Sequence, residues 1–129
     1  MYKDLPAAIG WLSETFGFVE HYRYGDPVSG AQVRLGNAWI QLSAGTSSYQ
    51  SPADLGFGTQ CLTVFVEEVE AHYARSQAAG ARILEELRET VYGELQYDVE
   101  DLEGHRWLFS RHARDADPAE WGATVSHPL

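Results

Sequence analysis

The chain has 129 residues, of which 44% are hydrophobic and 12% aromatic, and its net charge is −10. This composition supports the core of one domain or of two closely packed half-domains, and it excludes an intrinsically disordered chain. The negative charge repels phosphate backbones and anionic membranes, so we expect no nucleic-acid and no membrane partner. Cys61 is the only cysteine, which excludes an internal disulfide. The chain has neither an apolar run of the roughly 20 residues that span a membrane nor a signal peptide, so we expect a cytoplasmic protein.

The first half of the chain predicts one helix followed by three strands. Asp4 is placed to cap the helix, apolar residues recur at helical spacing after it, and Gly17 is a suitable stop. Strands are predicted at 18–24, 31–35 and 38–43, with Gly36 and Asn37 as the hairpin turn between the last two. The segment 45–57 is rich in Ser, Gly and Pro, which indicates a linker.

The second half repeats this plan. A strand at 59–66 precedes two acidic residues and a helix that ends at Gly80. A weak strand or loop at 83–87 follows, and then strands at 95–100 and 106–111 flank a turn at 101–104. Acidic side chains in this turn can hydrogen-bond the local backbone, and Gly104 tolerates a positive φ. Residues 113–129 form a polar tail, and we expect its Trp121 to pack partly on the body.

A glycine-led strand occurs in each half, as GNAWIQLS at 36–43 and GHRWLFS at 104–110. This echo, together with the repeated order of elements, predicts an internally duplicated α+β fold. Each half has the order β-α-β-β-β, so module one spans about 1–44 and module two about 58–112 of a single domain 1–129. In module one only Met1–Lys3 precedes the helix cap, so its opening strand is very short or the chain starts late.

The pattern resembles the vicinal oxygen chelate superfamily, which includes glyoxalase I, bleomycin-resistance proteins, fosfomycin-resistance enzymes and extradiol dioxygenases. Three stretches carry the resemblance: the opening at 4–18, the strand, acidic pair and helix at 64–80, and the turn DLEGHRW at 101–107. Leu102 stands in that turn where the family usually has Pro. Within the superfamily the chain is most similar to small bacterial proteins described as glyoxalase-like or PhnB-like. The resemblance implies two tandem βαβββ modules that form a curled mixed sheet with a concave cavity.

Strand alternation assigns side chains to that cavity, provided that no strand contains a bulge. The residues predicted to line a ligand-binding cavity are Trp39, Gln41, Cys61, Phe65, Asp98, Arg106 and Leu108. Two interpretations of Asp98 and Arg106 remain open: they form a cross-strand ion pair, or they recognise a polar ligand that stacks on aromatic rings. Cys61 is either a small buried filler or a nucleophile, and the second role requires a lowered thiol pKa.

The resemblance also implies where metal-dependent members hold their ion, namely on the opening strand and at Gln41, Cys61 and Leu108. The short opening strand supplies no assignable ligand, and Leu108 cannot coordinate a metal. The histidines show no His-Glu-x-x-His spacing either. A catalytic site needs three protein ligands. We therefore expect no metal cofactor, and the catalytic residues remain unassigned.

Three kinds of function follow from these observations. The first is a metal-free protein that binds an aromatic or cationic small molecule, such as an antibiotic. The alternative is a lyase, isomerase or dioxygenase of the family with an atypical metal site, and the third is a regulatory module without a ligand. The missing ligand at Leu108 favours the first. We also expect a homodimer, because a short opening strand leaves a sheet edge to be covered.

Overall fold

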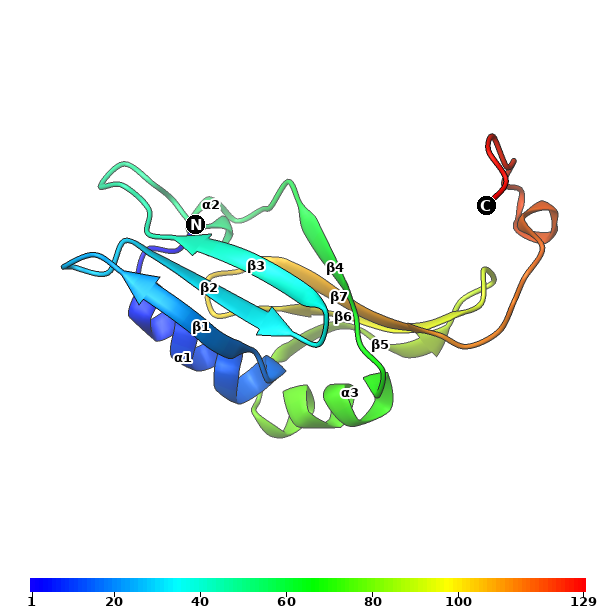
Figure 1. The fold of residues 1–129 in the computed structure, drawn as a ribbon, viewed down its shortest axis with the longest axis horizontal. Helices are drawn as coiled ribbons and strands as arrows, with labels where there is room; N and C mark the ends of the chain where they lie inside the picture. Colours follow the sequence, from blue (N-terminus) through cyan, green and yellow to red (C-terminus); the bar gives the residue numbers. More distant parts are fainter.

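A computed structural model describes all residues 1–129 (Figure 1). The elements in chain order are α1 (Leu5–Phe16), β1 (Val19–Tyr24), β2 (Gly30–Leu35), β3 (Ala38–Ser43), α2 (Pro52–Leu55), β4 (Cys61–Phe65), α3 (Val69–Ala78), β5 (Arg82–Glu89), β6 (Glu94–Glu100), β7 (Arg106–His112) and the 3₁₀ helix η1 (Pro118–Trp121). No helix is long and apolar enough to cross a membrane.

The strands form two sheets, which confirms the predicted α+β fold. The first sheet has the order β1-β2-β3 and is antiparallel, and the second has the order β4-β7-β6-β5 with β4 parallel to β7. The opening strand of module one is reduced to a parallel bridge between Tyr2 and Ala44. Strands β3 and β4 belong to different sheets.

Both long helices lie on the same side of the sheets (Figure 1). The side chain of Asp4 accepts a hydrogen bond from the Ala7 amide at 3.1 Å, as predicted for the cap of α1. Gly17 ends α1 in the left-handed region, where glycine carries no steric penalty. Arg75 of α3 then donates to the carbonyl oxygens of Ser13 and Glu14, so it satisfies the end of α1 and joins the two helices.

One apolar core serves both modules. Phe16 of α1 meets Phe109 of β7 with ring centroids 4.9 Å apart, and Trp107 and Phe109 are stacked. All three side chains are buried. Burial of aromatic rings of this size is the largest single contribution a side chain makes to a core. The modules are therefore held together by shared apolar contacts and not by the linker alone.

Two segments differ from the sequence-based expectation. The predicted linker contains the short helix α2, which begins with a reciprocal capping box between Ser51 and Asp54. The predicted weak strand at 83–87 is the full strand β5. The tail beyond β7 extends away from the helices (Figure 1), but its Trp121 packs on Tyr92 of the β5–β6 turn, with ring centroids 5.7 Å apart, as expected.

Candidate functional site

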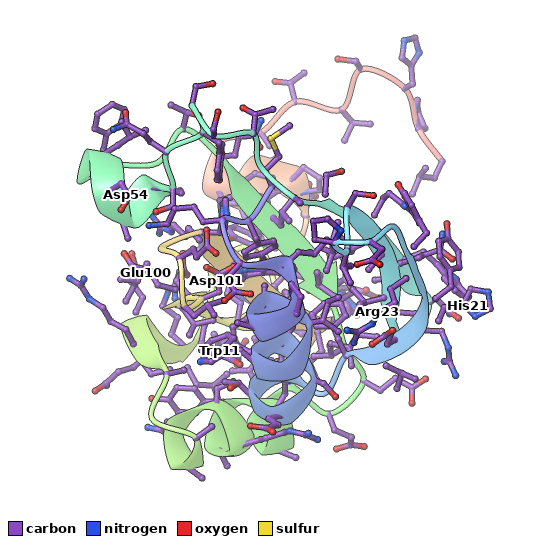
Figure 2. All side chains as sticks on the ribbon, turned by 90° about the vertical axis from the view of Figure 1, so that its left-hand side faces the viewer. Trp11, His21, Arg23, Asp54, Glu100 and Asp101 are labelled. Carbon is purple, nitrogen blue, oxygen red and sulfur yellow. The ribbon has the colours of Figure 1, made fainter.

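The turn at Asp101–His105 fixes the start of the chain against module two. The buried carboxylate of Asp101 accepts from the Tyr2 hydroxyl at 2.6 Å and from Trp107 Nε1 at 3.1 Å. Its other oxygen accepts from the backbone amides of Glu103 and His105, at 3.0 Å each. Burial and the nearby Asp101 carboxylate raise the pKa of Tyr2 far above its ordinary value, so its hydroxyl stays protonated. Figure 2 shows Asp101 close to the start of α1.

The rest of the turn continues this attachment. The Glu103 carboxylate accepts from the backbone amides of Lys3 and Asp4, at 2.8 and 3.2 Å. His105 Nε2 lies 2.8 Å from the Met1 carbonyl oxygen. Every residue from 1 to 4 is thus held by the turn directly or through its neighbour. The acidic turn, which the sequence singled out for its resemblance, is a structural clamp between the modules.

The four-stranded sheet presents one face to the helices and one away from them, which we call the open face of module two. The strand register pairs Cys61 of β4 with Arg106 of β7. It pairs Leu108 of β7 with Asp98 of β6. Residues that alternate along a strand share a face. The open face therefore carries five of the predicted cavity residues, namely Cys61, Phe65, Asp98, Arg106 and Leu108.

Asp98 is the centre of an ion-pair network on this face. The residue is 1% exposed, and its carboxylate accepts from Arg106 Nε at 2.9 Å and from Arg88 Nη2 at 3.2 Å. Glu85 of β5 binds the same Arg88 guanidinium at 2.9 Å. The cross-strand pair of Asp98 and Arg106 is thus present. It holds the Arg106 guanidinium at the surface of the open face, where it can donate further hydrogen bonds.

Cys61 lies exposed on β4, so the interpretation as a buried filler is wrong. The physical reason is topology, because β4 is the edge strand of its sheet and Cys61 points away from the helices. Desolvation raises the pKa of the thiol, and the attraction of Arg106 offsets this only in part. The thiolate is therefore disfavoured at neutral pH, which does not suit a nucleophile.

Trp39 and Gln41 lie on the other sheet, on a surface that we call the open face of module one. Trp39 is 54% exposed, and Gln41 accepts a hydrogen bond from the Tyr22 hydroxyl at 3.3 Å. Tyr24 is also exposed, and the His21 ring lies edge-on to Trp39 at 5.5 Å. Figure 2 shows His21 pointing outward from the body. This face is an aromatic platform with amide and hydroxyl groups beside it.

Sequence reasoning missed four residues of these faces, Tyr22, Tyr24, Glu85 and Arg88. The register of β1 slips between Glu20 and Tyr22, and that of β5 slips twice around Glu85. A bulge changes which side chains share a face, so simple alternation gives no signal there. The four adjacent residues HYRY at 21–24 do indicate an aromatic strand, but they do not indicate which of its side chains lie on the open face.

No single cavity of the chain unites the seven predicted residues. Gln41 and Arg106 both line a small space of about 130 Å³ between the two sheets. Phe65 instead lines a larger groove beyond the end of β4. Trp39, Cys61, Asp98 and Leu108 line none of the five pockets. The predicted residues therefore form two open faces of one chain and not an enclosed pocket.

The residues present do not fit the metal site that the resemblance implies. Leu108 has no donor atom, Gln41 is engaged with Tyr22, and the Tyr2 hydroxyl on the opening segment is directed to Asp101. Elsewhere, no three His, Cys, Asp or Glu side chains come together in an arrangement suited to a metal ion. Neither open face therefore gathers the three protein ligands that a catalytic metal centre requires.

Comparison with known proteins agrees with this architecture. A sequence profile of the Glyoxalase/Bleomycin resistance protein/Dioxygenase superfamily matches residues 1–109. The crystal structure of TioX from Micromonospora sp. ML1 is similar with a TM-score of 0.73 and 32% identity, over 90% of this chain and 94% of TioX.

Two further relatives extend the comparison. The uncharacterized protein Rv0887c of Mycobacterium tuberculosis is 26% identical over 133 residues, which cover 95% of this chain and 77% of that protein. A glyoxalase-related enzyme from Fulvimarina pelagi shares the fold alone, with a TM-score of 0.60 and 22% identity over 83% of this chain and 79% of the enzyme. The profile match over most of the chain, together with the paired modules, places this protein in the glyoxalase/bleomycin resistance/dioxygenase superfamily, the vicinal oxygen chelate proteins.

Proposed function

We propose that this protein is a metal-free binder of an aromatic or cationic small molecule, which it holds on its open faces. The observation that carries the proposal is the replacement of a donor by Leu108 at the centre of the face where metal-dependent members of the family bind their ion. The same face keeps a guanidinium, that of Arg106, fixed by a buried carboxylate. The other face offers exposed Trp and Tyr rings, which suit stacking against a flat or cationic ligand.

The proposed binder is a homodimer. Small-molecule sites bury most of their ligand, and each open face of the single chain is exposed. Val19, Tyr22, Tyr24 and Trp39 together leave a large apolar surface on module one, which single soluble chains rarely show. A second copy that sets its module-two face against this surface would enclose a cleft. Light scattering at micromolar concentration tests this, and a single monomer mass contradicts it.

A ligand screen tests the binding function. Purified protein is heated with a panel of aromatic and cationic compounds, because a ligand that binds the folded state raises the melting temperature by mass action. We expect a hit whose stabilisation is reduced in Trp39→Ala and in Arg106→Gln. Glu120→Gln, a surface change in the tail, serves as the control. A panel without any specific hit contradicts a ligand-binding role.

Metal analysis of the same protein separates the binder from the enzymatic alternative. We expect less than stoichiometric zinc, iron, manganese or nickel, and no change of melting temperature with a chelator. A stoichiometric ion that the chelator removes with loss of stability would contradict the proposal and favour a metal-dependent lyase or dioxygenase.

A further inference from the structure

A groove at the junction of the modules lies apart from the Asp98 ion-pair network and from the aromatic platform at Trp39. It runs between the β2–β3 turn, the end of β4 and the first turn of α3, at the right-hand end of β2 and β3 in Figure 1. Its volume is about 1160 Å³, against about 320 Å³ for the next cavity. Ligand pockets usually enclose roughly 300–1,000 Å³, so the groove has room for a drug-sized molecule.

The floor of the groove is apolar. Leu35 comes from module one, whereas Phe65 and Val66 come from module two. Phe65 is 64% exposed, which is unusual for a ring of this size at the end of a strand. An apolar body of a ligand placed here would cover the ring and remove its surface from water.

The walls of the groove are negatively charged. Arg111 is neutralised by Glu70, whose carboxylate accepts from its Nε at 3.0 Å, and His112 is bonded to Asp115 at 2.9 Å. Glu67 and Glu68 are exposed and neither lies within 4.0 Å of a basic side chain, although Glu68 is near enough to Arg111 to help raise the pKa of its guanidinium. Three acidic side chains, Glu67, Glu68 and Glu70, therefore share one arginine, Arg111, at the edge of the apolar floor. They also offset the partial positive charge of the α3 N-terminus, so the groove disfavours anions.

We propose that this groove binds an amphipathic organic monocation. The ammonium or guanidinium group lies between Glu67 and Glu68, and the apolar body lies on Leu35, Phe65 and Val66. Charge complementarity and volume select this class over an anion or a neutral polar molecule. The protein's net charge of −10 further concentrates cations near its surface. The site does not depend on the open faces, with which it shares only Phe65.

Three probes of similar size and different charge test the assignment. Phenylbutylamine, phenylbutanol and phenylbutyrate are titrated into isotope-labelled protein, and the backbone amide chemical shifts are followed. We expect the amine to shift the amides of residues 36–37 and 66–71 and to bind at least about fivefold tighter than the alcohol, which is the gain from about 1 kcal/mol of charge attraction at a solvated site. The butyrate binds more weakly than the alcohol.

Matched variants make the test specific. The double variant Glu67→Gln and Glu68→Gln is expected to remove the preference of the amine over the alcohol while the alcohol still binds. The control Glu86→Gln and Glu120→Gln changes the net charge equally at exposed positions outside the groove, and it should keep the preference. Equal affinity for all three probes, or equal loss in both double variants, overturns the proposal. So do amine-induced shifts confined to β3, β6 and β7.

Discussion

The turns that lead into the last strand of each module, β3 and β7, are packed differently, although the sequences around them are similar. The turn at Gly36–Asn37 in module one is open, and a Cβ on Gly36 would meet nothing within 4 Å. The turn at Asp101–Gly104 in module two is packed, and a Cβ on Gly104 would come within 2.8 Å of the Ala53 amide nitrogen. The two similar stretches thus form one free hairpin and one clamp. The same glycine-led stretch can therefore end a plain turn in one module and a packed clamp in the other.

The largest effect is expected when the clamp loses its carboxylate. Asp101→Ala leaves the Tyr2 hydroxyl, Trp107 Nε1 and two backbone amides without their acceptor in a buried place. Since each orphaned donor costs about 1–3 kcal/mol and water relieves some of them, we expect a loss of about 4 kcal/mol. Urea denaturation measures it. Asn37→Ala in the open turn should change stability by no more than about 0.5 kcal/mol. Equal losses at the two positions would refute the distinction between hairpin and clamp.

The next effect concerns the ion-pair network of Asp98 on the open face of module two. Asp98→Ala removes the common acceptor of Arg88 and Arg106, but both guanidiniums are partly exposed and regain water. We therefore expect a loss of about 2 kcal/mol, below the 3–5 kcal/mol of a fully buried pair. In module one, Glu20→Ala breaks the exposed pair with Arg23 and should cost at most about 1 kcal/mol. Chemical denaturation of the two variants measures both losses. A larger loss for Glu20→Ala than for Asp98→Ala would contradict the prediction.

A third effect depends on pH at the junction of the modules. His72 Nε2 donates to the Phe16 carbonyl oxygen at 2.7 Å, and its Nδ1 lies 2.6 Å from the Tyr97 hydroxyl, which can donate to it when the ring is neutral. Burial lowers the pKa of His72 below its ordinary 6.5. Between pH 6.5 and the lower folded-state pKa, the unfolded chain binds a proton at His72 that the folded chain does not bind. The free energy of unfolding therefore falls as the pH drops through this range.

The slope from this one proton is at most about 1.4 kcal/mol per pH unit. Imidazole resonances followed by NMR between pH 8 and 4 check the order of titration. Exposed His112, whose pKa is raised by Asp115 and Glu94, should titrate above 6.5 and His72 below it. The reverse order would show that His72 is protonated in the folded protein.

The smallest effect on stability is expected on the open face of module one. Trp39→Ala removes a half-exposed ring, so the free energy of unfolding should change by no more than about 0.5 kcal/mol. Affinity for an aromatic ligand found by the thermal screen should nevertheless fall about tenfold, because stacking contributes roughly 0.5–1.5 kcal/mol beyond burial. Isothermal titration would measure it. An unchanged affinity would show that the ligand does not bind at the open face of module one.

Local patterns predicted much of the fold. The bounds of β3 agree with the sequence, and the cap at Asp4 and the stop at Gly17 lie where the helix signals put them. These features depend on neighbours a few residues apart, which a sequence shows directly. Strand β5, with the sequence RILEELRE, has low strand propensity, and it forms because β6 pairs with it. Such tertiary support has no local signature.

The candidate site was predictable only in part, for the same reason. Alternation put Asp98 and Arg106 on one face, and they are bonded there. The exposure of Cys61 follows from the position of β4 at a sheet edge, which requires the strand order. Arg88 and Tyr22 joined the faces through bulges, which shift the alternation that the prediction assumed.

The bond between Tyr2 and Asp101 spans 99 positions of the chain. During synthesis, the opening segment leaves the ribosome long before its acceptor is made, so until then only the backbone bridge to Ala44 ties Tyr2 to module one. Loop closure over such a separation is entropically costly and slows folding. The nascent first half should therefore stay sensitive to proteases until the acidic turn emerges and completes the molecule.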